Sequence, residues 1–418
     1  MKSESVTAEN PYEVLRNRDF VLYLLARFVA SIGSQMLTVA IGWELYERTH
    51  KPLALGLVGL TQMAPIILLI LPAGYVAENF DRKKTLLWTV FLTILASLGL
   101  AAISWTQAPV GWIYGCLAVA GIARTFLWPA SQAFLPQLVS RKNFSRAVTW
   151  NTGAFHLSSV IGPAGGGAMI ALTPHPAVVY CATALAAAIC FALIIFVRSH
   201  HQAKARQTIT LSSLVAGFKF VYQTKIILGT ITLDMFAVLL GGATALLPVY
   251  AKDILHAGPN GLGLLQAALP LGSIVCSLYL AHRKPLQKAG TALIWSVAIF
   301  GSATIVFGFS KSFWLSFAML AVCGVFDNVS VVIRHTLVQL LTPDAMRGRV
   351  SAVNSLFIGT SNELGGTESG FVAQFCGPVF AVVSGGVGTI LVVIATALIW
   401  PQIRKYGRLD SASEETPI

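Results

Sequence analysis

Seven charged side chains interrupt long apolar stretches of this chain, and they could carry chemistry that ordinary membrane-spanning residues cannot. They are Arg27, Arg124, Asp234, Asp327, Arg334, Glu363 and Glu368. A charge in hydrocarbon is costly, so it normally faces a water-filled cavity or an oppositely charged partner. We therefore interpret these residues as the lining of a polar cavity inside a membrane protein.

The acidic and basic members of this set predict different roles. Desolvation disfavours the charged form of a carboxyl group, which suits cyclic proton uptake and release, whereas arginine stays protonated. We assign proton coupling to Asp327 and Glu363, with Asp234 and Glu368 in reserve. The candidates for biasing these carboxylates or binding a substrate are Arg27, Arg124, Arg334, His156 and Asn151. The alternatives are fixed ion pairs that only lock helix packing, and a histidine that only packs.

The elements that must position these residues are membrane-spanning helices. The chain is 55% hydrophobic and 11% charged, whereas a soluble domain carries about 25% charged residues. Apolar stretches of about 20 residues match a helix crossing a bilayer. We place twelve at 19–46, 53–77, 85–104, 111–134, 145–171, 177–197, 226–251, 261–281, 289–309, 312–340, 349–374 and 378–400. The expected fold is an all-α membrane protein, with the seven charges on the first, fourth, seventh, tenth and eleventh spans.

The distribution of basic residues predicts orientation and excludes nucleic acid as the partner. Of 29 Lys and Arg residues, 22 lie in the tails or in the loops after even-numbered spans. Cytoplasmic loops carry such an excess, so both termini are expected in the cytoplasm. Anionic lipid then accounts for the net charge of +12.

The chain is expected to divide into two six-helix halves, 19–197 and 226–400. A cytoplasmic tail, 1–18, contains a short surface helix that begins at Asn10-Pro11. A cytoplasmic linker, 198–225, contains an amphipathic helix, although an early start to the seventh span would explain the same pattern. A second tail covers 401–418. At a shift of 203 residues the halves share identities such as Gly121 with Gly324, which indicates an internal repeat.

Two local motifs suggest moving parts. The loop after the second span combines small, acidic and basic residues that could latch a gate: Gly74, Glu78, Asp81, Arg82, Lys83 and Lys84. A basic loop that only sets topology is the alternative. Gly162-Pro163 should kink the fifth span, because proline removes a helical hydrogen bond. The kink could be a hinge or static packing.

These motifs resemble those of the major facilitator superfamily. The loop from Gly74 to Lys84 is similar to its signature loop, with Glu78 in place of the more usual Asp. The stretch Thr342-Pro343-Asp344-x-x-Arg347-Gly348-Arg349 is similar to an element of the branch that holds siderophore exporters and macrolide-type efflux proteins. Gly162–Gly167 is similar to the tail of the antiporter motif, although Thr149 and Ser158 replace its glycines.

The resemblance implies a monomeric transporter of the bacterial inner membrane that works by alternating access. It would expel amphipathic small molecules, such as drugs, macrolide-like compounds or siderophores, in exchange for protons. An uptake symporter or facilitator of the same fold is the alternative, and a non-transporting receptor or scaffold is a more remote one. We see no nucleophile, metal-ligand or dinucleotide motif, so neither an enzyme nor a cofactor is expected.

Overall fold

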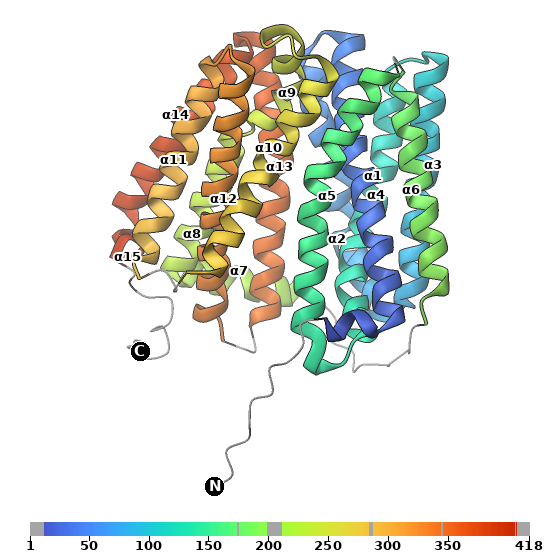
Figure 1. Cartoon of the computed structure of the whole chain (residues 1–418). Helices are drawn as coiled ribbons and strands as arrows, with labels where there is room; N and C mark the ends of the chain where they lie inside the picture. Colours follow the sequence, from blue (N-terminus) through green and yellow to red (C-terminus); the bar gives the residue numbers. More distant parts are fainter. Residues whose placement is uncertain are drawn as a thin grey trace.

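The computed structural model describes residues 12–173, 175–198, 211–283, 287–343, 346–405 and 407, and helices form almost all of this part (Figure 1). The amino half contains α1 (Arg18–Thr49), α2 (Pro52–Asn79), α3 (Arg82–Thr106), α4 (Gly111–Leu138), α5 (Phe144–Leu172) and α6 (Ala177–Phe196). A short 3-10 helix, Glu13–Arg16, precedes α1. The expected start of that surface helix at Asn10-Pro11 lies outside the described residues.

The carboxyl half begins with a broken span. It consists of α8 (Lys225–Leu240), a 3-10 turn (Ala243–Leu246), α9 (Leu247–Val249) and a π-helical turn (Tyr250–Ile254). The break falls at Gly241-Gly242, where a Cβ on Gly242 would lie 2.3 Å from the carbonyl oxygen of Gly365. Glycine therefore lets this span touch its neighbour. The half continues with α10 (Gly258–Ala281), α11 (Ala289–Phe309), α12 (Phe313–Leu341), α13 (Arg347–Cys376), α14 (Pro378–Ile399) and α15 (Pro401–Lys405).

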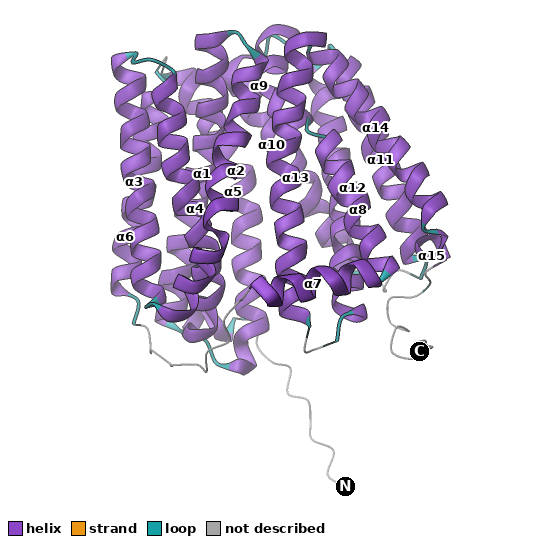
Figure 2. Ribbon diagram, turned by 180° about the vertical axis from the view of Figure 1, so that it is seen from behind, coloured by secondary structure: helices purple, strands orange, loops and turns teal. Residues whose placement is uncertain are grey.

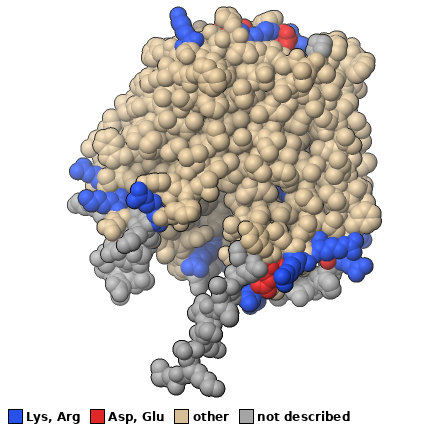
Figure 3. All heavy atoms as spheres, viewed as in Figure 1, with Lys and Arg blue, Asp and Glu red and all other residues tan. Residues whose placement is uncertain are grey.

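Eleven helical segments in the described part are long and apolar enough to cross a membrane, which confirms the all-α membrane architecture. The remaining long helix is α13, with 30 residues. It is less apolar than those segments because it carries Asn362, Glu363, Thr367 and Glu368. Figure 3 shows charged side chains gathered at the two rims of the bundle, with a broad uncharged surface between them.

The two halves pack their helices in the same order. In the amino half α1 packs on α5 and α6, and α4 packs on α2 and α3. In the carboxyl half α8 packs on α13 and α14, and α12 packs on α10 and α11. The corresponding helices occupy equivalent positions, as an internal repeat requires. Between the halves lies α7 (Leu211–Gln223), which runs crosswise under α13 (Figure 2).

The halves touch mainly through two helix pairs, α2 with α13 and α5 with α10. Glycines allow both contacts. A Cβ on Gly370 would lie 2.6 Å from the Cα of Gly56, and one on Gly167 would lie 2.5 Å from the carbonyl oxygen of Pro259. These contacts involve the start of α2 and the end of α5, so they lie at one end of the bundle. We call this the sealed end.

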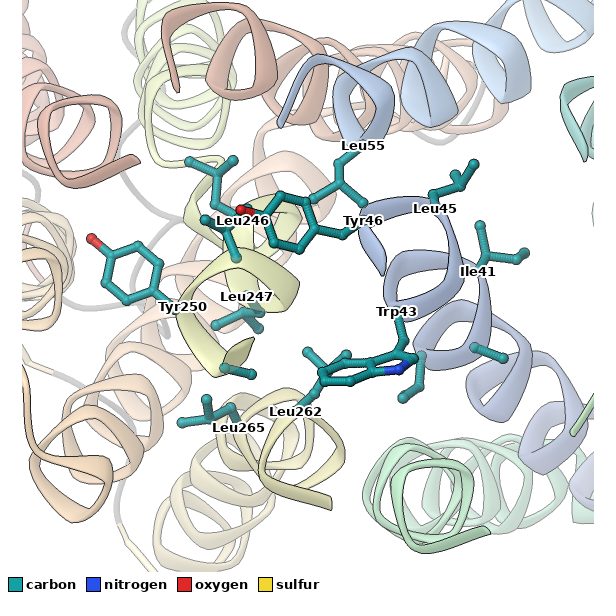
Figure 4. Close-up of a cluster of buried hydrophobic side chains, with 14 of the residues drawn as sticks. Ile41, Trp43, Leu45, Tyr46, Leu55, Leu246, Leu247, Tyr250, Leu262 and Leu265 are labelled. Atoms are coloured by element: carbon teal, nitrogen blue, oxygen red, sulfur yellow. The ribbon is translucent and has the colours of Figure 1, made fainter. Parts of the chain in front are cut away.

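Buried hydrophobic clusters show that the opposite end is split. One cluster at the sealed end joins both halves, with Leu45 and Leu55 from the amino half and Leu246 and Leu262 from the carboxyl half (Figure 4). The other clusters each belong to one half alone. This second end holds the start of α1, the 82–84 loop and α15, and we call it the basic end. Figure 3 shows the surface hollowed there between the halves.

Candidate functional site

An ion pair crosses between the halves deep in the bundle. Arg124 on α4 donates to Glu363 on α13 at 3.0 Å, and to the amide oxygen of Gln62 on α2 at 3.2 Å. The backbone allows this approach because residue 59 is glycine: a Cβ there would lie 2.4 Å from the carbonyl oxygen of Glu363. The pair therefore sits where α2 and α13 touch.

The two members of this pair differ in exposure. The Arg124 side chain is 59% exposed and the Glu363 side chain is 16% exposed. An arginine in the middle of a membrane-spanning helix that stays open on one side requires a wet space beside it. Arg124 therefore bridges the two halves while one side of its guanidinium stays open.

A second ion pair is enclosed within the carboxyl half. Arg334 on α12 pairs with Asp234 on α8, and their side chains are only 7% and 8% exposed. The Nε atom of Arg334 is buried and has no hydrogen-bond partner among the described residues. Asp327, half-buried and seven residues earlier on α12, lies within electrostatic range of both. The geometry of this pair suits a packing lock.

The other predicted site residues are not brought into these pairs. Arg27, Asn151 and His156 are half-buried and form no hydrogen bond or ion pair with any described residue. Among the described residues, Glu368 accepts a single long hydrogen bond, 3.4 Å, from the neighbouring Ser369 hydroxyl. Their assignment to the cavity stays a prediction.

The predicted gating loop forms its bonds inside the amino half. Asp81 caps α3 by accepting from the backbone N–H groups of Lys83 and Lys84, while Arg82 donates to the carbonyl of Ala133. Lys83 donates to the carbonyls of Ile195 and Val197, near the end of α6. The side chain of Glu78 lies outside the described residues. No described contact reaches the other half, as expected if a latch at the basic end is open.

The predicted hinge lies on packed faces. A Cβ on Gly162 would lie 2.5 Å from the Cβ of Gln35 on α1. The carbonyl oxygen of Pro163 would lie 2.4 Å from a Cβ on Gly263 of α10. Pro163 therefore belongs to the contact between the halves, and α5 continues through it without a break. Motion about this point stays a prediction.

Sequence reasoning missed a polar lock at the sealed end. The Tyr46 hydroxyl donates to the Asp253 carboxylate across the halves. The ammonium of Lys252 lies 3.5 Å from a carboxylate oxygen of Glu47 and over the ring of Trp43. Tyr46 and Trp43 point from α1 toward the carboxyl half (Figure 4). These residues lie at span ends, where polar side chains are ordinary. The only sequence signal was the high polar content of both segments.

Comparison with known proteins identifies the family. The family model described as "Transmembrane secretion effector" matches residues 9–416. The enterobactin exporter EntS of Citrobacter koseri is 26% identical over 407 residues, which cover 96% of each chain. The enterobactin exporter EntS of Escherichia coli is 26% identical over 397 residues, which cover 93% of each chain.

Solved structures with the same fold are more distant in sequence. A POT family transporter in complex with 5-aminolevulinic acid superposes with a TM-score of 0.73 at 13% identity, covering 93% of this chain and 97% of that one. A bacterial homolog of the human lysosomal transporter Spinster, in an inward-facing conformation, gives 0.66 at 13% identity, covering 98% and 100%. The chain belongs to the transmembrane secretion effector family of the major facilitator superfamily, and it is a multi-pass membrane transporter rather than an enzyme.

Proposed function

We propose that this protein exports an amphipathic small molecule of the siderophore class in exchange for protons, by alternating access. Its relatives from Citrobacter koseri and Escherichia coli are enterobactin exporters. The observation that carries the mechanism is the shared hydrophobic core at one end and the divided cores at the other. Two rigid halves joined at one end are what a rocking carrier needs.

The basic end faces the cytoplasm in this proposal, because Lys and Arg concentrate there. The structure then corresponds to a cytoplasm-open state, which a substrate made inside the cell can enter. The sealed end faces the periplasm of a bacterial inner membrane. Export requires the halves to part at the sealed end and to close at the basic end.

Glu363 supplies the coupling. With its carboxylate charged, it holds Arg124 and so ties α13 to the amino half. Protonation removes the negative charge and weakens a contact that crosses the boundary between the halves. Exchange requires that the substrate opens this pair by binding Arg124 while Glu363 is charged, and that the carrier returns with Glu363 protonated. A single proton thereby acts on both the position of the halves and the charge of the cavity.

The remaining carboxylates have different roles in this scheme. Asp234 is held by buried Arg334, and we assign it to stabilising the carboxyl half. Asp327 is a second coupling site, since its carboxylate forms no hydrogen bond with the described residues. Glu368 stays in reserve.

Transport by reconstituted protein tests the proposal. Liposomes with a trapped pH-sensitive dye are given enterobactin as the probe, and both proton and enterobactin movement are followed. We expect wild-type protein to move protons when enterobactin is added and to concentrate enterobactin against its gradient when a pH gradient is imposed. Glu363→Gln should retain downhill exchange and lose gradient-driven accumulation.

A surface carboxylate provides the matched control. Glu13 pairs with Arg146 at 3.0 Å and its side chain is 42% exposed, so Glu13→Gln should leave coupling intact. Accumulation by Glu363→Gln at the wild-type level would overturn the coupling assignment. Binding of enterobactin without any movement by the wild-type protein would overturn the export function.

A further inference from the structure

A groove on the outer surface of the amino half ends beneath a lysine. This cavity, of about 300 Å³, lies between α3 and α6 at the basic end and is lined by Lys84, Leu87, Trp88, Phe91 and Phe191. Apart from the Lys84 ammonium, the side chains that form it are apolar. It lies away from the boundary between the halves, so it is separate from the Arg124–Glu363 site of the transport cycle proposed above.

The spacing of its residues makes the groove run along α3. Lys84, Leu87, Trp88 and Phe91 lie three, four and seven residues apart and so share one face of the helix. At 1.5 Å per residue, the groove extends about 10 Å from Lys84 toward the membrane centre. Trp88 is 65% exposed, and its ring packs edge-on against the ring of Phe91, with 5.9 Å between the ring centroids. Aromatic rings thus form a firm wall for a narrow apolar guest.

Of the three consecutive cations that begin α3, Lys84 is the one whose side chain has no partner among the described residues. Arg82 and Lys83 donate to backbone carbonyls of α4 and at the end of α6. Lys84 is exposed and forms no side-chain hydrogen bond or ion pair with the described residues. Asp81, the nearest described carboxylate in the chain, accepts from two backbone N–H groups instead. The Lys84 ammonium is therefore available to a ligand at the mouth of the groove.

We propose that this groove binds an anionic phospholipid, with one acyl chain along Trp88 and Phe91 and the phosphate on Lys84. Both the charge and the shape of the groove match a phospholipid, because a phospholipid has an anionic phosphate directly above a hydrocarbon chain. Basic residues at the inner leaflet attract anionic lipid. A second copy of the protein fits less well, since it would cover an ammonium without supplying a counter-charge.

Native mass spectrometry of the full chain in detergent tests the site. The probes are phosphatidylglycerol and phosphatidylethanolamine with identical acyl chains. We expect the wild-type protein to retain phosphatidylglycerol preferentially. Lys84→Gln should lower its affinity about fivefold, which corresponds to roughly 1 kcal/mol for one basic residue near an anionic surface, and should leave phosphatidylethanolamine binding unchanged. Trp88→Ala should weaken both lipids.

Lys225→Gln is the matched control, because Lys225 is an exposed lysine at the start of α8 and lies outside the groove. It should keep wild-type affinity. Equal losses in Lys84→Gln and Lys225→Gln would show general surface charge and overturn the site. A dimer that becomes monomeric in Trp88→Ala, with lipid binding unchanged, would identify a protein partner and also overturn it.

Discussion

Mutation of the two intramembrane ion pairs should destabilise the protein to very different extents, and Asp234→Asn is the most informative perturbation. It leaves Arg334 charged, 7% exposed and without its counter-ion. Removing one partner of a buried pair costs about 3–5 kcal/mol, because the remaining charge stays desolvated. Asp327 is close enough to Arg334 to offset part of its charge, so we expect a loss of stability near the lower of these two values.

Glu363→Gln should cost far less. The Arg124 side chain that it leaves behind is 59% exposed, so solvent screens the charge, and exposed pairs contribute about 1 kcal/mol or less. The two single variants should therefore differ by about 2 kcal/mol or more in free energy of unfolding. The change in chemistry is matched, since each replaces a carboxylate by an amide.

Reversible unfolding in mixed detergent micelles measures these free energies. The double variant Asp234→Asn, Arg334→Gln removes both buried charges and should regain part of the lost stability. Equal stabilities for Asp234→Asn and the wild-type protein would refute the idea of a dry structural pair. A loss in Glu363→Gln as large as that in Asp234→Asn would refute the contrast between an enclosed and a water-facing site.

Two substitutions at the sealed end should favour separation of the halves there. Gly263→Ala places a Cβ 2.4 Å from a backbone carbonyl oxygen of α5, and such overpacking costs about 1–3 kcal/mol. It should therefore raise the maleimide reactivity of a cysteine placed in the buried core at the sealed end. The control Gly165→Ala, whose Cβ meets no atom within 4 Å, should not. Tyr46→Phe removes the hydrogen bond to Asp253 across the halves and should also raise that reactivity, while Tyr114→Phe, which loses a bond inside the amino half, should not. Unchanged reactivity in both test variants would contradict the assignment of this end as a gate.

The fold could be predicted from the sequence because it depends on local properties. Apolar length marks most of the helices, and the 203-residue repeat matches the equivalent packing of the two halves. The same apolar pattern predicts the span at 349–374, which corresponds to α13 even though this helix carries Glu363 and Glu368. The charged residues inside the spans could also be identified from the sequence, and two of them, Glu363 and Arg334, lie in ion pairs in the structure.

The pairing of those charges could not be predicted in the same way. The 203-residue shift makes positions 124 and 327 equivalent but predicts no contact, and Arg124 in fact pairs with Glu363, 239 residues away. That contact crosses between the halves, so helical periodicity within one half does not predict it. The hydrogen bond between Tyr46 and Asp253 also crosses between the halves and could not be predicted for the same reason. In the sequence, both residues look like ordinary polar residues at span ends.

A distance between the two halves at the sealed end tests the central claim most directly. Spin labels at residue 106, exposed at the end of α3, and at residue 311, exposed between α11 and α12, report the separation of the halves by double electron–electron resonance in a cysteine-free background. Glu363→Gln mimics the protonated carboxyl group, so it should populate a longer distance that the wild-type protein populates less at neutral pH and more on acidification. An identical distance distribution in the variant and in the wild-type protein at every pH would contradict coupling of Glu363 to the movement of the halves.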